Sequence, residues 1–222
     1  MDDFELGGDE LEKVLKDLEN INKWLGGNKV TLSGIKKILR ENPEELEWNI
    51  VDVGCGNGAM LREIAHWGKK NNIKLRLTGI DANKHAILIA EKLSENYPNI
   101  EFKAKDVFSE TYRKQNFDIV LCTLTLHHFT DEQIIELLKL FHSQAKYGVL
   151  INDLHRSKIA YRLFQVFCAV FINNEIARKD GLTSILRGFK RIDLERFSAK
   201  IPARQAEIKW KWAFRYQWII QK

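Results

Sequence analysis

A short glycine-rich segment constrains this chain more than any other part of its sequence. An apolar run, Ile50-Val51-Asp52-Val53, leads into Gly54-Cys55-Gly56-Asn57-Gly58, and a helical pattern follows at once. Glycine reaches backbone angles that other residues avoid and lets a ligand approach the main chain closely. A helix that begins there presents unpaired N–H groups and a partial positive charge. Strand, turn and helix together predict a cradle for a nucleotide-type ligand.

The glycine spacing alone leaves two cofactor classes open. Gly54, Gly56 and Ala59 satisfy the dinucleotide fingerprint G-x-G-x-x-G/A, which is a weak signal when it stands alone. The tighter spacing G-x-G-x-G is also present, and an acid, Asp52, precedes the first glycine by two residues. A plain turn that only joins a strand to a helix is the alternative, and the signals farther along the chain count against it.

The rest of the chain alternates between strand and helix patterns. Strands are expected at 49–53, 75–80, 100–105, 117–122 and 148–152, and helices at 59–70, 84–96, 131–145 and 158–173. This alternation predicts an α/β fold with a mostly parallel sheet and helices on both faces. Segments 207–212 and 214–220 read as two further strands. The tight turn near Ala213 allows only an antiparallel hairpin between them.

Two helices are expected before the first strand, one over 10–25 and one from Thr31 or Ser33 to about Glu41, separated by Gly26-Gly27-Asn28. We interpret the chain as a single domain, 1–222, with an N-terminal helical cap at 1–46 and a helical lid insertion at 157–200. Within this insertion, residues 159–172 are apolar almost all round, which predicts a helix that is buried or covers an apolar ligand.

Composition narrows the function classes. Hydrophobic residues make up 45% and charged residues 29%, as in ordinary soluble domains. The net charge of +5 comes from scattered Lys and Arg, so no nucleic-acid partner is expected. The cysteines Cys55, Cys122 and Cys168 form no C-x-x-C pair, which argues against a disulfide framework and a metal site. No apolar run reaches the roughly 18 residues of a membrane span, and the acidic N-terminus is unlike a signal peptide. A cytoplasmic monomer or homodimer is expected, with no stable membrane insertion.

The segment from Val51 to Gly58 closely resembles motif I of class I S-adenosylmethionine (SAM)-dependent methyltransferases. The string FDIVLC at 117–122, followed by Leu126-His127-His128, is similar to motif IV and the next loop of small-molecule methyltransferases. The terminal hairpin is similar to the end of their seven-stranded, Rossmann-like sheet. The resemblance covers roughly 50–157, and the flanking segments look like small bacterial enzymes of the ubiquinone and polyketide type.

The resemblance implies SAM as cofactor and S-adenosyl-L-homocysteine (SAH) as product. Asp81, at the end of the second strand, would accept the ribose hydroxyls, cap the following helix, or do both. Asp106 would meet the adenine amino group, and the backbone N–H of Val107 a ring nitrogen. The other expected cofactor contacts come from the glycine loop and the ends of two strands: Asp52, Gly54, Cys55, Gly56, Asn57, Gly58, Ala82, Cys122 and Thr123.

The candidate catalytic residues follow the fourth and fifth strands. His155 is the preferred general base, with Asp153 or Asn152 as an orienting partner, because histidine titrates near neutrality. An exposed loop position is the alternative for His155. One of His127 and His128 would face the substrate, and His128 is taken as the candidate. No role is assigned to two arginines of the insertion, Arg178 and Arg187.

The implied reaction is methyl transfer to a small apolar or aromatic acceptor, most simply at a hydroxyl oxygen. Carbon or nitrogen acceptors stay open. An NAD(P)-dependent oxidoreductase would use a similar loop, but the terminal hairpin and the lack of a Tyr-x-x-x-Lys motif count against it. A non-catalytic module that binds SAM or RNA is the remaining alternative.

Overall fold

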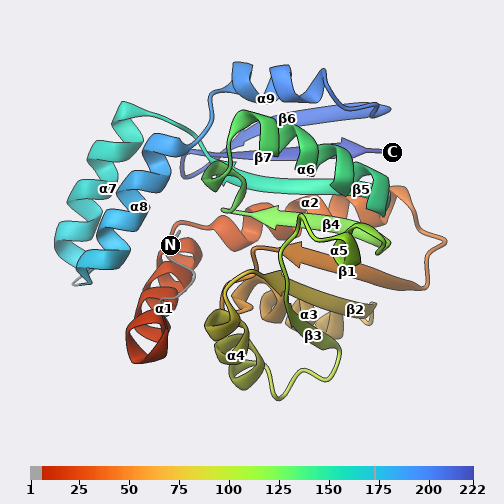
Figure 1. The fold of residues 1–222 in the computed structure, drawn as a ribbon, viewed down its shortest axis with the longest axis horizontal. Helices are drawn as coiled ribbons and strands as arrows, with labels where there is room; N and C mark the ends of the chain where they lie inside the picture. Colours follow the sequence, from red (N-terminus) through yellow and green to blue (C-terminus); the bar gives the residue numbers. More distant parts are fainter. Residues whose placement is uncertain (1–6, 173) are drawn as a thin grey trace.

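The structure, a computed structural model, describes residues 7–172 and 174–222. A seven-stranded sheet with the strand order β3-β2-β1-β4-β5-β7-β6 forms its centre (Figure 1). The strands are β1 (Glu47–Val53), β2 (Lys74–Asp81), β3 (Ile100–Ala104), β4 (Phe117–Thr123), β5 (Ala145–Leu154), β6 (Gln205–Lys211) and β7 (Arg215–Gln221). The first five pair in parallel, and β7 runs antiparallel to both β5 and β6. The predicted mostly parallel sheet with a terminal antiparallel hairpin is confirmed.

Helices cover both faces of the sheet. They are α1 (Gly8–Trp24), α2 (Gly27–Glu41), α3 (Ala59–Lys70), α4 (Lys84–Leu93), α5 (Glu110–Arg113), α6 (Asp131–Gln144), α7 (Lys158–Phe171), α8 (Glu175–Arg187) and α9 (Arg191–Ser198), with a 3-10 turn, η1 (Leu126–His128). One apolar cluster joins α2, α3 and α4 to the sheet, and a second joins α5, α6 and α9 to the opposite face. Alternation along β1 sends Ile50 into the first cluster and Val51 into the second.

Three helices stand beyond the sheet rather than on its faces. Figure 1 shows α1, α7 and α8 on the left, the side toward which the arrows of β1 and β4 point. They share their own apolar cluster, in which Val14 of α1 meets Phe164 of α7 and Ile185 of α8. Because ligands of parallel α/β sheets bind at the carboxyl ends of the strands, these helices lie where they can enclose a ligand.

Several helix boundaries differ from the sequence-based expectation. Helix α2 begins at Gly27 rather than at Thr31 or Ser33, because Gly26 adopts a left-handed conformation (φ 75°) that turns the chain directly from α1 into α2. Within the expected lid insertion, two further helices, α8 and α9, follow α7. The expected end of the preceding helix at 173 falls outside the described residues, as do residues 1–6 of the expected cap.

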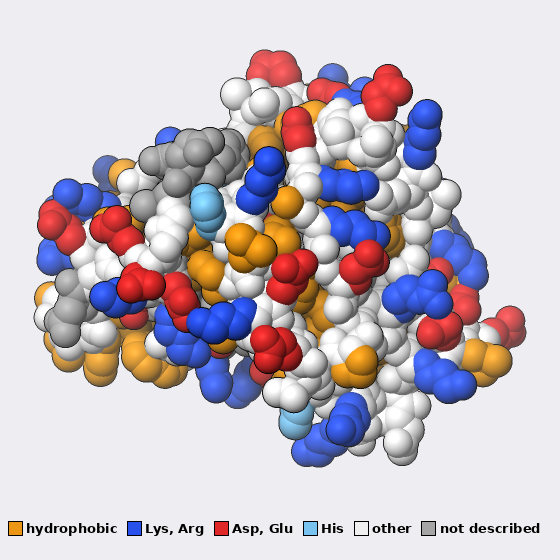
Figure 2. Space-filling view, turned by 60° about the horizontal axis from the view of Figure 1, so that its bottom comes forward, with side chains coloured by type: hydrophobic (Ala, Val, Ile, Leu, Met, Phe, Trp, Pro, Cys, Tyr) orange, Lys and Arg blue, Asp and Glu red, His pale blue; other side chains and the backbone are white. Residues whose placement is uncertain are grey.

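Helix α7 differs from the expectation of burial all round. Phe164 and Cys168 are buried against α1 and α8, whereas Ile159, Val166 and Val170 are largely exposed. Figure 2 shows hydrophobic side chains gathered at the lower left, on the side where α7 and α8 lie, while charges of both signs are mixed over the rest of that face. Of the helices in the described ranges, none is long and apolar enough to cross a membrane.

Candidate active site

The glycine loop after β1 has a backbone that only glycine adopts easily. Gly54, Gly56 and Gly58 have φ values of 74°, 53° and 74°. A Cβ atom on Gly54 would lie 2.3 Å from Thr125, and one on Gly58 would lie 2.5 Å from Phe102. These two glycines are therefore required by packing as well as by conformation. The nearest atom to a Cβ on Gly56 is 3.6 Å away, so the loop is open at its middle glycine.

Asp81 fastens the glycine loop to the end of β2. One carboxylate oxygen accepts a hydrogen bond from the Gly56 N–H (2.9 Å) and the other from the Asn83 N–H (2.9 Å). Asn83, not Asp81, caps α4, since its Oδ1 accepts from the first turn of that helix. Burial raises the pKa of Asp81, and the two N–H groups oppose that rise. A carboxylate offers about four lone pairs, so Asp81 retains capacity to accept ligand hydroxyls.

Asp52 lies at the end of β1, beneath the glycine loop, and is 2% exposed. Its Oδ1 atom has no hydrogen-bond partner in the described part of the chain. Burial, and then the negative charge of Asp81, raises its pKa to about 7. An unpaired buried carboxyl is costly unless a ligand completes its bonds. The loop and these two acids therefore fit a cofactor that offers hydroxyl groups to Asp81 and a cationic or N–H group to Asp52.

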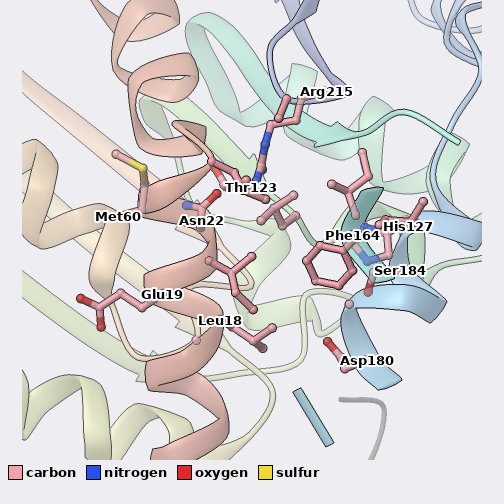
Figure 3. Close-up of a pocket in the computed structure, with 18 of the residues that line it drawn as sticks. Leu18, Glu19, Asn22, Met60, Thr123, His127, Phe164, Asp180, Ser184 and Arg215 are labelled. Atoms are coloured by element: carbon pink, nitrogen blue, oxygen red, sulfur yellow. The ribbon is translucent and has the colours of Figure 1, made fainter. Parts of the chain in front are cut away.

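A cavity of about 430 Å³ extends from this loop toward α7 and α8 (Figure 3). Helix α1 closes it on the loop side, because Glu19 accepts a hydrogen bond from the Asn57 side chain (3.0 Å) and pairs with Arg62 (3.5 Å). The far walls are mostly apolar, with Leu18, Phe164 and residues of α8 facing the space. A largely apolar cavity with a few polar groups is the usual form of a small-molecule site.

A histidine–aspartate pair lies at the floor of the cavity. His127 Nδ1 is 2.7 Å from Asp153 Oδ1, and the His127 N–H donates to Asp153 Oδ2 (3.3 Å). Burial raises the pKa of Asp153, but the charge and hydrogen bond of His127, with the Leu154 N–H, hold it below its usual value. His127 is 5% exposed, lines the cavity, and its Nε2 has no hydrogen-bond partner within the described residues. The carboxylate therefore orients the imidazole and leaves Nε2 for a ligand.

Sequence reasoning missed the pairing of His127 with Asp153. It linked Asp153 to His155, which follows the end of β5 and lies outside the cavity lining. The available signal was the adjacency of β4 and β5: the histidine pair follows one strand and Asp153 ends the other. The ends of neighbouring parallel strands bring such side chains together. His128 also lines the cavity, with its ring centroid 4.3 Å from that of His127.

His155 lies outside the cavity lining. Its Nδ1 accepts a hydrogen bond from the Trp210 indole (3.2 Å), and its ring packs against Phe214 and Tyr216. Burial and the charge of Lys190 lower the pKa of His155, which favours the neutral ring. The structure thus places His128 in the cavity lining and Asp153 against His127, whereas His155 lies outside the lining. A catalytic role for His155 stays a prediction.

The remaining expected cofactor residues separate into two groups. Those that line the cavity are Asp52, Gly54, Cys55, Gly56, Asn57 and Thr123. Cys122 is buried in the core on the α6 face, because alternation along β4 turns it away from Thr123. Gly58 is held by packing against Phe102. Ala82, Asp106 and Val107 lie along the ends of β2 and β3, where the Asp106 carboxylate accepts the Phe108 N–H (2.9 Å). Adenine recognition by these residues stays a prediction.

The fold, the glycine loop and the acid that ends β2 define a class I SAM-dependent methyltransferase. The family model described as a methyltransferase domain matches residues 45–186, and the chain belongs to that family. A ubiquinone biosynthesis O-methyltransferase of Ralstonia nicotianae is 27% identical over 184 residues, which cover 76% of this chain and 70% of the relative. One from Coxiella burnetii is 28% identical over 129 residues, 57% of this chain and 51% of the relative. The chain thus spans about half the length of the Coxiella relatives.

Two solved structures show the same fold. A plantazolicin methyltransferase, BpumL, in complex with SAH has a TM-score of 0.68 at 18% identity, over 97% of this chain and 91% of that one. The magnesium protoporphyrin IX methyltransferase of Synechocystis PCC 6803, with bound SAM, has a TM-score of 0.57 at 14% identity, over 91% and 82%. At these identities the similarity extends to the fold and not to the acceptor.

Proposed function

We propose that this protein transfers a methyl group from SAM to a hydroxyl oxygen of a small, largely apolar or aromatic acceptor. The observation that carries the proposal is that His127 lines an apolar cavity continuous with the glycine loop, is oriented by Asp153, and has an Nε2 atom without a hydrogen-bond partner among the described residues. An imidazole so held can take the proton of an acceptor hydroxyl through Nε2 as that oxygen is methylated.

The cofactor end of the cavity binds through groups that are already in position. Asp81 has acceptor capacity for the ribose hydroxyls, and Asp52 offers the carboxyl oxygen that lacks a partner among the described residues. SAM, when bound, supplies a methyl group on a positively charged sulfur that leaves as neutral SAH. The protein then contributes alignment, exclusion of water and a proton acceptor.

The acceptor class is inferred from the far walls. The apolar side chains of α1, α7 and α8 suit a ring or an alkyl group better than a polar substrate. The ubiquinone O-methyltransferase relatives support a phenolic hydroxyl as the methylated group. We also propose that 1–46 and 157–200 act as the cap and lid of this cavity, since α1, α7 and α8 enclose it.

The test is methyl transfer from labelled SAM to a panel of phenols, catechols, thiols and amines, with the methylated atom identified by mass spectrometry and NMR. His127→Asn should lower kcat by about 10² to 10⁴, the usual contribution of a general base. Its affinity for SAH, measured by calorimetry, should stay within about threefold of the wild type.

The matched control is His155→Ala, which removes a histidine outside the cavity lining and should retain most of the turnover. Loss of turnover in His155→Ala with full turnover in His127→Asn would assign the base to His155 instead. Methylation at carbon or nitrogen, with no oxygen product from any hydroxylated acceptor, would contradict the proposed reaction.

A further inference from the structure

Arg215, the first residue of β7, is a buried cation that lines the cavity. The residue is 2% exposed, and its Nε and Nη1 atoms have no hydrogen-bond partner in the described ranges. Figure 3 shows its side chain reaching toward Thr123, at the end of β4. Burial lowers the pKa of Arg215 to about 10, and the charge of Asp153 opposes this, so the guanidinium is positive at neutral pH.

No carboxylate of the described chain neutralises this guanidinium by direct contact. Asp153, whose charge acts on Arg215, is engaged by His127 and the Leu154 N–H. Arg215 is paired in register with Leu154, so alternation along β5 turns Asp153 toward the opposite face of the sheet. A buried charge without a paired counter-charge is strongly unfavourable unless a ligand supplies that charge.

The surroundings of the guanidinium favour an anion. The side chain reaches the start of α2: a Cβ on Gly27 would lie 2.9 Å from Arg215 Cζ and 1.8 Å from Asn22 Oδ1. Glycine at 27 therefore allows the guanidinium and the Asn22 side chain to lie against the start of α2. The first turn of α2 has no side-chain cap, since Gly26 precedes it, and the N-terminus of this 15-residue helix adds partial positive charge.

We propose that Arg215, with the N-terminus of α2, forms a binding site for a carboxylate of a ligand in this cavity. The planar guanidinium can donate two parallel N–H bonds to the two oxygens of a carboxylate, a geometry that lysine does not reproduce. The inference uses the same cavity as the proposed methyl transfer. Two ligands can bring the carboxylate: the amino-acid end of the cofactor, or an acceptor that carries an acid group beside its hydroxyl.

The experiment is calorimetry on Arg215→Gln, Arg215→Lys and the wild type, with two pairs of probes. SAH is compared with 5′-deoxy-5′-methylthioadenosine, which lacks the carboxylate, and benzoate is compared with benzyl alcohol on the SAH complex. Arg215→Gln should weaken at least one carboxylate probe by tenfold or more and leave its uncharged counterpart within about twofold. Arg215→Lys should restore only part of the loss.

The two pairs of probes identify which ligand, cofactor or acceptor, brings the carboxylate. Selective loss of SAH affinity assigns it to the cofactor, and selective loss of benzoate binding with SAH unchanged assigns it to the acceptor. Arg196→Gln removes an exposed arginine paired with Asp131 and controls for net charge. It should change neither the affinity for SAH nor the affinity for benzoate. Retained binding of the uncharged probes shows that the variant is folded.

Wild-type affinity of Arg215→Gln for both SAH and benzoate, or absence of benzoate binding in the wild type together with unchanged SAH affinity, would overturn the inference. That result differs from a failure of the proposed reaction, which would show as the absence of an oxygen-methylated product while the wild type still binds SAH.

Discussion

The two ends of the cavity are built on different principles. The end at the glycine loop is made of main chain and short side chains, and its N–H groups are fixed by Asp81 and by the Ile80 carbonyl. The other end is made of long apolar side chains from α1, α7 and α8, which meet in a cluster separate from the sheet core. The first end gains its shape from backbone conformation, and the second from side-chain packing.

This difference teaches which substitutions each end tolerates. A position fixed by backbone angles and by a close contact leaves no room for one extra carbon atom. A position fixed by packing between helices can exchange side chains of similar volume at small cost. The glycine-loop end is therefore the rigid part of the site, and the helical end is the part that can change with the acceptor.

The largest expected effect is that of Gly54→Ala. Alanine at position 54 would have to adopt a left-handed backbone (φ 74°), and its Cβ would lie 2.3 Å from Thr125. We expect a loss of roughly 3 kcal/mol or more in the free energy of unfolding, because steric overlap adds to backbone strain of about 1–3 kcal/mol. Affinity for SAH should fall beyond detection. Chemical denaturation and calorimetry measure the two effects.

Gly26→Ala is the matched control, because Gly26 has φ 75° and no atom within 4 Å of the added Cβ. It should lose only about 1–2 kcal/mol, the cost of the left-handed backbone alone. Equal losses in the two variants would show that contact with Thr125 contributes nothing to the rigidity of the loop.

Phe164→Ala tests the helical end. Phe164 is 8% exposed and packs between α1 and α8. Its truncation should lower the free energy of unfolding by about 2–3 kcal/mol. This loss is somewhat below the usual range for a buried phenylalanine, because one side of the ring faces the cavity. Val166→Ala, at a position 66% exposed on the same helix, should change it by less than about 0.5 kcal/mol. A large loss of SAH affinity in Phe164→Ala would contradict the separation of the two ends.

Asp52→Asn tests the electrostatics of the loop end, and its effect on stability depends on pH. Asp52 has a folded-state pKa of about 7, above its usual 3.8, so the folded protein binds more protons than the unfolded chain between these values. The carboxyl therefore destabilises the fold progressively as the pH rises from about 4 to 7. The variant should be more stable than the wild type at pH 8, and nearly equal to it at pH 4.

Unfolding curves at a series of pH values measure this difference. A constant difference between Asp52→Asn and the wild type across the series would mean that Asp52 ionises as it does in water. Addition of SAH at pH 8 should reduce the difference, because a bound cofactor supplies the partner that Asp52 Oδ1 lacks among the described residues.

The sequence predicted most of the glycine-loop end because its signals are local. Gly54, Gly56 and Gly58 act through their own backbone angles, and the alternation of strands and helices follows from patterns within single segments. These features are readable without knowing which distant residues meet. The mostly parallel sheet and the terminal hairpin were predicted in the same way.

The helical end escaped prediction because it depends on contacts between distant segments. Arg215 reads as an ordinary charged residue at the start of a strand, and its burial arises only because the start of α2, nearly 190 residues earlier in the chain, lies against it. The pairing of His127 with Asp153 likewise joins two neighbouring strand ends. Helix α8, with its polar sequence, was missed because the packing of Ala177 and Ile185 on α1 and α7 stabilises it.

Helix α1 connects the two ends physically. Glu19 holds its middle to Asn57 of the glycine loop, and Trp24 at its last turn lies against Phe167 and Phe171 of α7 (ring centroids 6.3 Å apart in both pairs). A 17-residue helix is a stiff rod about 25 Å long. The contact with the glycine loop and the contact with α7 are therefore held by one rigid element. We expect any shift of α1 at Glu19 also to move the indole of Trp24, whose fluorescence would report it.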